Sequence, residues 1–236
     1  MLKFNRIAII PARGGSRRIV NKNLVDFFGK PIISYTIDNA IQSKLFDKIH
    51  VSTDSAKVKK FLKKRKISIE FQRPKKLSGD NVPISEVLRF VVNQYKKKKF
   101  FFNEIWLLYA CSPLITHMDL ISASKKFNLT KKKYPMMSIR EYDAPIQWAY
   151  KKKRDIYSPV NKKFLKLRSQ DIEKNFFESA SFIIFSSSQL YKKNNFKFYG
   201  FELKKNYAQD IDTIEDLEIA KALYQHNLKS KKGLKS

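Results

Sequence analysis

The chain has 236 residues and a mass of 27.8 kDa, with 43% hydrophobic and 14% aromatic residues. That length can bury a sizeable core in one domain, and no apolar run approaches the roughly 20 residues of a membrane span. The single cysteine, Cys111, excludes a disulfide framework and a cysteine-rich zinc site. We therefore expect a soluble cytoplasmic protein, with any metal chemistry resting on carboxylates and a hard ion such as Mg²⁺.

The charge is strongly basic, with 49 basic and 21 acidic residues and a formal net charge of +28. Such a charge favours polyanions, nucleic acid among them. Most basic residues are lysines in runs, such as residues 96–99, 131–133 and 151–153. These runs lack the aromatic residues interleaved with basic ones that a base-stacking surface needs. We expect solvated lysine-rich faces, with no nucleic-acid and no membrane partner.

Apolar runs alternate with helical spacing along the first 130 residues. Strands are predicted at Arg6–Ala12, Lys48–Thr53, Ile67–Phe71, Glu104–Tyr109 and Phe182–Phe185. Helices are predicted from Pro31 through IISYTIDNAIQ, from a cap at Asp54 to about Lys66, over Pro83–Lys97, from about His117, and over Thr213–Leu228. This order predicts a three-layer, Rossmann-like α/β fold with a mostly parallel central sheet.

The segment from Pro135 to Ile172 is polar and less regular, and we expect an arm or a small additional sheet there. Residues from Lys229 onward are rich in lysine and are expected to fray. The chain shows no internal repeat and no linker that would divide it. The sequence therefore predicts one domain over residues 1–228, with a basic tail at 229–236.

A glycine loop follows the first predicted strand. It reads Pro11-Ala12-Arg13-Gly14-Gly15-Ser16-Arg17-Arg18 and continues to Asn21-Lys22-Asn23. Two glycines let a backbone bend close to a ligand, and N–H groups in such a turn can converge on phosphate oxygens. The arginines and the lysine would surround a triphosphate with positive charge. The spacing matches neither the dinucleotide fingerprint nor the Walker A motif, and a purely structural turn stays open as the alternative.

Two aspartates with one residue between them, Asp210 and Asp212, precede the last predicted helix. In an extended stretch their side chains point the same way. Two such carboxylates can hold Mg²⁺ against a polyphosphate. The alternative is that Asp212 or Thr213 simply caps the helix, with Glu215 and Asp216 favouring its N-terminus.

Several short motifs, taken together and in order, resemble the CMP-sialate synthetase (acylneuraminate cytidylyltransferase) family over roughly residues 5–225. They are IAIIPARGGSRRIVNKN, Phe28-Gly29-Lys30-Pro31-Ile32 with Tyr35, Val51-Ser52-Thr53-Asp54-Ser55, Arg73-Pro74 with Leu77-Ser78 and Asp80, Arg168-Ser169-Gln170-Asp171, and Gln209-Asp210-Ile211-Asp212-Thr213. The resemblance implies a glycosyltransferase-A-like nucleotidyltransferase. Such an enzyme moves CMP from CTP to the anomeric hydroxyl of a nine-carbon acidic sugar and releases pyrophosphate.

Site residues follow from the same resemblance. Arg13 and Lys22 would grip the triphosphate and act in catalysis together with Asp210 and Asp212, which would hold Mg²⁺. The nucleotide site would comprise Ala12, Arg13, Gly14, Gly15, Ser16, Lys22, Asn23 and Arg73, the last two placing the cytidine. Arg168 would meet the sugar carboxylate, with Gln147 and Gln170 beside the acceptor. The segment at about 135–175 would be a dimerisation arm that reaches a partner subunit's site.

Details within the motifs resemble the pseudaminic-acid branch of the family. Ala144-Pro145-Ile146-Gln147 carries Gln147 where sialic-acid enzymes usually have lysine. Two departures concern the acceptor: Ala180 ends a Glu-Ser-Ala stretch in place of the usual glycine, and Cys111 stands in the sequence after the central strand. For Cys111 a small buried thiol is the expected role.

Other functions remain as alternatives. The acceptor could be N-acetylneuraminic or legionaminic acid, or the enzyme could be another sugar-acid nucleotidyltransferase, such as one for an eight-carbon acid or a different nucleotide. A remote alternative is a basic, non-enzymatic protein that binds polyanions, which steeply salt-dependent affinity without turnover would reveal.

Overall fold

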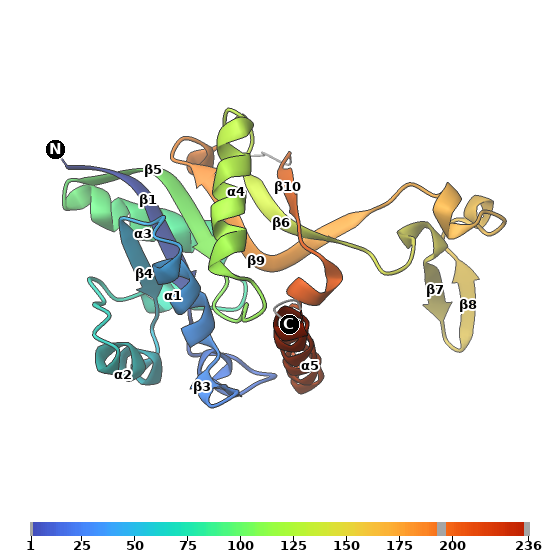
Figure 1. Cartoon of the computed structure of the whole chain (residues 1–236), viewed down its shortest axis with the longest axis horizontal. Coiled ribbons are helices and arrows are strands. Elements are labelled where there is room, and N and C mark those ends of the chain that lie inside the picture. Colours follow the sequence, from blue (N-terminus) through green and yellow to red (C-terminus); the bar gives the residue numbers. More distant parts are fainter. Residues whose placement is uncertain (1, 193–196, 234–236) are drawn as a thin grey trace.

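The computed structural model describes residues 2–192 and 197–233. A six-stranded sheet with the order β10-β6-β9-β5-β1-β4 lies at its centre (Figure 1). Its strands are β1 (Leu2–Pro11), β4 (Lys48–Ser52), β5 (Phe100–Leu108), β6 (Met136–Glu141), β9 (Phe176–Ser186) and β10 (Tyr199–Glu202). Neighbouring strands are parallel except where β9 pairs with β5 and β6. The sheet is therefore mixed and mostly parallel, which confirms the predicted α/β fold class.

Helices cover both faces of this sheet. Helices α1 (Ile33–Gln42), α2 (Ala56–Lys64) and α4 (His117–Leu129) pack on one face, and α3 (Ile84–Lys97) packs on the other. Side chains alternate along β1, so that Ala8 and Ile10 join the first layer while Ile7 and Ile9 join the second. The three layers expected from the sequence are present.

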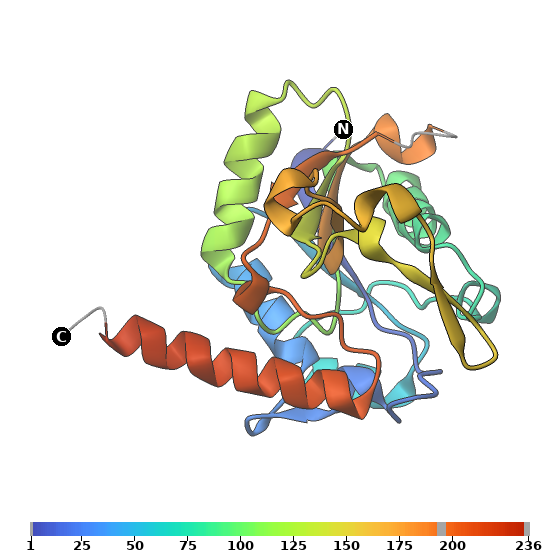
Figure 2. The same cartoon turned by 90° about the vertical axis from the view of Figure 1, so that its right-hand side faces the viewer.

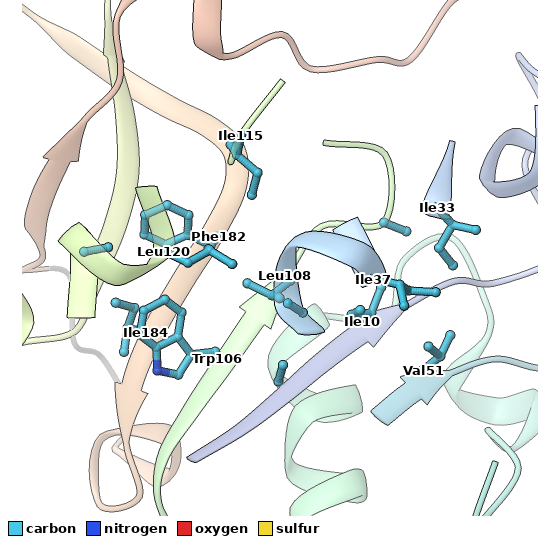
Figure 3. Packing of buried hydrophobic residues seen from close by; sticks show 14 of the residues in the cluster. Ile10, Ile33, Ile37, Val51, Trp106, Leu108, Ile115, Leu120, Phe182 and Ile184 are labelled. Carbon is cyan, nitrogen blue, oxygen red and sulfur yellow. The ribbon is translucent and has the colours of Figure 1, made fainter. Parts of the chain in front are cut away.

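The larger core cluster lies between the sheet and α1, α2 and α4. Trp106 and Leu108 of β5 are fully buried there, and Phe182 of β9 packs beside Trp106 with ring centroids 5.9 Å apart (Figure 3). Burying one large apolar side chain stabilises a fold by about 1.5–3 kcal/mol. This packing fixes the strands whose ends carry the candidate site.

Helix α5 (Ile214–Gly233) packs against the segment that follows the glycine loop and then projects beyond the body (Figure 2). Leu217 and Ala220 are buried with Ile19, Phe27 and Ile32. Ile214, at the first position of the helix, is 56% exposed. The helix continues to Gly233, so its predicted end at Leu228 was wrong, and residues 234–236 of the predicted tail lie outside the described residues.

An arm leaves the sheet after β6 and returns at β9 (Figure 1). It contains an antiparallel hairpin of β7 (Tyr150–Lys153) and β8 (Ile156–Pro159) that stands clear of the body. The predicted irregular segment therefore begins too early. Its residues 136–141 form β6, because Met136 is fully buried and the strand pairs with both β9 and β10.

Two other local predictions were wrong, and three short strands were missed. Residues 67–71 form no strand: Phe71 packs on His50 and Tyr95 instead of extending the sheet beyond β4. The cap of α2 is Ser55, whose hydroxyl accepts from the Val58 N–H, and not Asp54. The short strands β2 (Asp26–Phe27), β3 (Lys30–Pro31) and β10 were not predicted, since two to four residues give no usable periodicity.

None of the helices in residues 2–192 and 197–233 combines the length and the apolar character needed to cross a membrane.

Candidate active site

The glycine loop leaves the carboxyl end of β1 and begins beside the carboxyl end of β4. The Ala12 N–H donates to the Ser52 carbonyl at 2.9 Å, which continues the pairing with β4. The Gly14 N–H donates to Asp54 Oδ1 at 2.9 Å. A side chain at Gly14 would place its Cβ 3.1 Å from the Ser55 Cβ, so a larger residue would have to displace Ser55 by a few tenths of an ångström. A carboxylate of the chain thus already occupies this N–H group.

A cavity of about 550 Å³ opens beside this loop at the carboxyl ends of the strands. Ligands of open α/β sheets bind at this edge. Its lining includes Arg13, Ser16, Arg17, Arg18, Lys22, Asn23, Arg73, Asp80, Tyr109, Ala110, Cys111, Ala180, Asp210 and Asp212. Seven of the predicted nucleotide and metal residues are among them. Ala12 is fully buried behind the cavity, and the exposed Gly14 and Gly15 do not line it.

The cations of the loop are gathered by two carboxylates. Asp80 forms ion pairs with Arg13 and, at 2.6 Å, with Arg17. Asp212 pairs with Arg18 at 2.6 Å and with Lys22 at 3.0 Å. Two carboxylates therefore hold four cations in the wall of one cavity, where these cations can meet phosphate oxygens with charge-assisted hydrogen bonds.

Asp210 and Asp212 both face the cavity, as the alternation of side chains predicted. Asp210 is open to the cavity, yet the surrounding protein desolvates it, and this effect together with the neighbouring Asp212 raises its pKa. For Asp212 the effect of burial is outweighed by Lys22 and Arg18, so that its pKa is lowered. The raised pKa of Asp210, to which Asp212 contributes, marks a carboxylate whose negative charge a bound cation would stabilise.

The capping alternative for Asp212 can be answered from the hydrogen bonds at the start of α5. The Thr213 hydroxyl accepts from the Asp216 N–H at 3.2 Å, and Asp216 Oδ2 accepts from the N–H groups of Asp212 and Thr213 at 3.0 and 2.8 Å. Thr213 and Asp216 thus form a reciprocal capping box. The carboxylate of Asp212 is left to face Lys22, Arg18 and the cavity.

Asp210 and Asp212 could hold a divalent ion if a ligand supplied the rest of its coordination shell. Over residues 2–192 and 197–233 no group of three or more acidic, histidine or cysteine side chains could hold a metal. Asp210 and Asp212 supply two carboxylates. Mg²⁺ is commonly held by one or two carboxylates, with phosphate oxygens and water completing its shell. The pair therefore suits a metal that arrives with a polyphosphate.

Asn23 and Arg73 line the cavity and also hold its walls. The Asn23 amide donates to the Arg13 carbonyl at 2.9 Å. Arg73 is 4% exposed, and its guanidinium donates to the Leu77 carbonyl, with Nε at 2.7 Å. Both side chains fix loops at the rim, so replacing either one would disturb the shape of the cavity as well as any contact with a nucleotide.

Tyr109, Ala110 and Asp80 line the cavity but were not predicted as site residues. The Tyr109 hydroxyl donates to Glu178, and burial together with that carboxylate raises the pKa of the tyrosine. Asp80 belongs to one of the motifs that resemble the family, but nothing in the sequence around it indicated that it would line the site. Cys111 and Ala180, the two residues that depart from the family's motifs, do line the cavity.

The predicted acceptor residues lie on the arm, outside this cavity. The Gln147 amide donates to the Glu173 carbonyl at 3.3 Å, and Arg168 pairs with Asp171 at 2.9 Å. Gln170 is exposed in a second hollow of about 400 Å³ between the two ends of the arm. The structure does not bring these three side chains to Asp210 and Asp212 within one chain.

An α/β sheet with a basic loop and two carboxylates at its carboxyl edge defines a nucleotidyltransferase type of site. A family model described as cytidylyltransferase matches residues 7–234. A pseudaminic acid cytidylyltransferase of Campylobacter jejuni is 35% identical over 233 residues, which cover 96% of this chain and 99% of the relative. The chain belongs to the cytidylyltransferase family and is an enzyme of that class.

More distant similarities agree with this assignment. An N-acylneuraminate cytidylyltransferase of Streptococcus agalactiae is 27% identical over 225 residues, 89% of this chain and 51% of the relative. The solved structure of a CMP:2-keto-3-deoxy-manno-octonic acid synthetase complexed with CTP has a TM-score of 0.69 at 16% identity and covers 94% of this chain and 99% of that one. A 4-diphosphocytidyl-2C-methyl-D-erythritol synthase of Anaerococcus prevotii has a TM-score of 0.61, also at 16% identity, over 94% and 98% of the two chains. These two structures support the fold.

Proposed function

We propose that this enzyme transfers CMP from CTP to the anomeric hydroxyl of a nine-carbon acidic sugar, with pseudaminic acid as the favoured acceptor. The observation that carries the proposal is the cavity in which the cations of the glycine loop face Asp210 and Asp212. Full-length similarity to a pseudaminic acid cytidylyltransferase supports the acceptor. Gln147 in the Ala-Pro-Ile-Gln stretch supports it further.

In this proposal the triphosphate lies along the glycine loop. Arg13 and Lys22 contact its phosphates, Ser16 lies beside them, and Asn23 and Arg73 border the cytidine. Ala12, Gly14 and Gly15 act through the backbone geometry of the turn. Asp210 and Asp212 hold Mg²⁺, which when bound neutralises phosphate charge and orients the reacting phosphorus.

The reaction needs positioning and charge stabilisation more than covalent chemistry. The anomeric oxygen attacks the α-phosphorus of CTP, the bond to the bridging oxygen breaks, and pyrophosphate leaves in line. Arg13 and Lys22 stabilise the charge that develops on the leaving group. Among the described residues no histidine lines the cavity, and an aspartate that lines it could receive the proton of the attacking hydroxyl.

The arm is proposed to complete the acceptor site of a second copy in a homodimer. Its hairpin exposes Ile156, Tyr157, Val160 and Tyr150, each between 52% and 74% exposed. Apolar side chains gathered on a projecting element mark an interaction surface. Residues 1–228 would then act as one nucleotidyltransferase domain, with Gln147, Arg168 and Gln170 delivered to the partner's cavity.

Mixing two inactive variants tests this arrangement. Asp212→Ala removes a residue of the cavity, and Arg168→Ala removes a residue of the arm. If the arm serves a second copy, unfolding and refolding the two variants together restores part of the activity, because mixed dimers contain one intact pair. Two variants that remain inactive in verified mixed dimers would show that each chain uses its own arm.

The function itself is tested by pyrophosphate release with CTP and Mg²⁺. Pseudaminic, legionaminic and N-acetylneuraminic acids are offered separately, and ATP, GTP and UTP replace CTP in matched reactions. We expect turnover with CTP and pseudaminic acid. Turnover with N-acetylneuraminic acid instead would favour the function named for the Streptococcus agalactiae relative. Binding of long polyanions without any turnover would favour the non-enzymatic alternative.

A further inference from the structure

The rim of the cavity carries a carboxylate for which the proposed function gives no task. Asp80 lies in the loop between Leu77 and Pro83, and its side chain is 36% exposed. One of its oxygens pairs with Arg13 and the other pairs with Arg17 at 2.6 Å. A negative charge in the wall of a triphosphate site opposes binding unless it performs another role.

The contacts of Arg13 indicate what that role is. Its Nη1 atom reaches both Asp80 and, at 3.4 Å, the Ser78 carbonyl. A guanidinium has five N–H donors in a rigid plane, so fixing one nitrogen sets the direction of the others. Arg13 also lines the cavity, and its remaining donors are thereby held in one orientation at that wall.

Arg17 depends on the same carboxylate even more strongly. Its side chain is 83% exposed, and a long exposed side chain loses up to about 2 kcal/mol of rotamer entropy when it is immobilised. Asp80 provides the contact that keeps this guanidinium at the rim. Without that contact a phosphate would have to order Arg17 as it binds, which weakens binding.

We propose that Asp80 is a positioning residue for the β- and γ-phosphates: it holds Arg13 and Arg17 in the wall of the cavity, as Asp212 holds Arg18 and Lys22 in the same wall. This inference rests on the proposed CTP site and adds a residue to it. The loop that carries Asp80 is itself fixed, because Arg73 donates to the Leu77 carbonyl at its start.

Two effects of removing the charge of Asp80 oppose each other. The loss of one negative charge attracts the triphosphate, and the loss of the ion pairs releases two arginines. Two guanidinium groups already neutralise this carboxylate, and the site is open to water, so the repulsion that it exerts is weak. The loss of preorganised arginines therefore dominates.

The experiment compares ligands with different numbers of phosphates. Binding of CTP, CMP and pyrophosphate to the full chain is measured by calorimetry for wild type and Asp80→Asn. We expect Asp80→Asn to weaken CTP and pyrophosphate about tenfold, within the range of charge-assisted hydrogen bonds, and to weaken CMP less than twofold. Turnover should show a raised KM for CTP with kcat changed little. Asp80→Glu, which restores the carboxylate, should recover most of the lost affinity.

Asp38→Asn is the matched control. Asp38 pairs with Arg65, its side chain is 31% exposed, and it does not line the cavity. Its substitution changes the net charge of the protein by the same amount as Asp80→Asn and should leave CTP binding unchanged.

Tighter or unchanged binding of CTP by Asp80→Asn overturns the proposal, and so does an equal loss of CTP and CMP affinity, which would indicate a change in cavity shape. A wild-type protein that binds no CTP would instead reject the proposed nucleotide site itself. Circular dichroism and thermal melting of all three variants verify that each is folded before binding is measured.

Discussion

Ala180 adopts a backbone conformation that glycine would accept more easily. Its φ is 48°, in the left-handed region, where an L-residue other than glycine costs about 1–2 kcal/mol. Ala180→Gly removes that cost. The substitution also gives the unfolded chain more freedom, worth about 0.4–1 kcal/mol, and removes a half-buried methyl group, worth a few tenths. We expect a net stabilisation of about 0.5 kcal/mol, or roughly 1–2 °C in Tm for a chain of this size.

Ala110→Gly is the control for this prediction. Ala110 also lines the cavity, is 5% exposed, and has no positive φ. Its replacement loses a buried methyl group and gains unfolded-state freedom, for a loss of about 1.5 kcal/mol, or roughly 3–6 °C. Differential scanning calorimetry of wild type, Ala180→Gly and Ala110→Gly measures both changes in Tm. If Ala180→Gly melts as far below wild type as Ala110→Gly, the strain assigned to position 180 is refuted.

Three further predictions concern stability, reactivity and turnover. Glu104 is 2% exposed and bonded to Lys132, Arg6 and Trp106; these contacts together outweigh burial and lower its pKa. Glu104→Gln should lower the free energy of unfolding by about 2 kcal/mol at pH 7. A carboxyl group whose pKa is lowered by folding stabilises the protein fully above its unfolded-state pKa of about 4.5, and this contribution is lost as the pH falls through the folded-state pKa. In urea melts, the difference in free energy of unfolding between wild type and Glu104→Gln should therefore shrink over that pH range. Although Cys111 is partly exposed, desolvation by the surrounding protein raises its pKa to about 12, so at pH 8 iodoacetamide should alkylate it at least about tenfold more slowly than in the denatured chain. Asp212→Ala should abolish most pyrophosphate release and leave Tm nearly unchanged, since Thr213 and Asp216 still cap α5; near-normal turnover would remove Asp212 from the metal site.

The sequence predicted the parts of the fold that local pattern determines. The apolar runs that became β1, β4 and β5 and the spacing of Val87, Val91 and Tyr95 in α3 were correctly interpreted. The prediction of a strand at 67–71 was wrong because a short apolar run can bury its side chains without joining a sheet. Here Phe71 packs against His50 and Tyr95. The four residues of β10 become a strand only because β6 lies beside them, and that pairing is not visible in sequence.

In the candidate site, too, the features set by neighbouring residues were predicted and those set by distant residues were missed. Residues of the glycine loop are contiguous, so their grouping followed from sequence, as did the common direction of Asp210 and Asp212. Asp80 joins Arg13 across 67 positions of chain, and no local pattern indicates an ion pair at that separation. The occupied N–H of Gly14 was missed for the same reason, because Asp54 reaches it from the end of another strand.

The positive charge of the chain comes mostly from lysine, whereas the positive charge of the cavity comes mostly from arginine. Four of the ten arginines line the cavity, whereas among the lysines of residues 2–192 and 197–233 only Lys22 does. The lysine runs at 96–99, 131–133 and 151–153 contribute no lining residue. Arginine offers a planar fork that matches phosphate oxygens, whereas lysine is a flexible point charge. The concentration of arginine in the cavity is what a site shaped for a polyphosphate requires, and it does not follow from the net charge of +28. Long polyanions should therefore bind the lysine-rich faces weakly and in a strongly salt-dependent manner, without competing for the cavity that CTP is proposed to occupy.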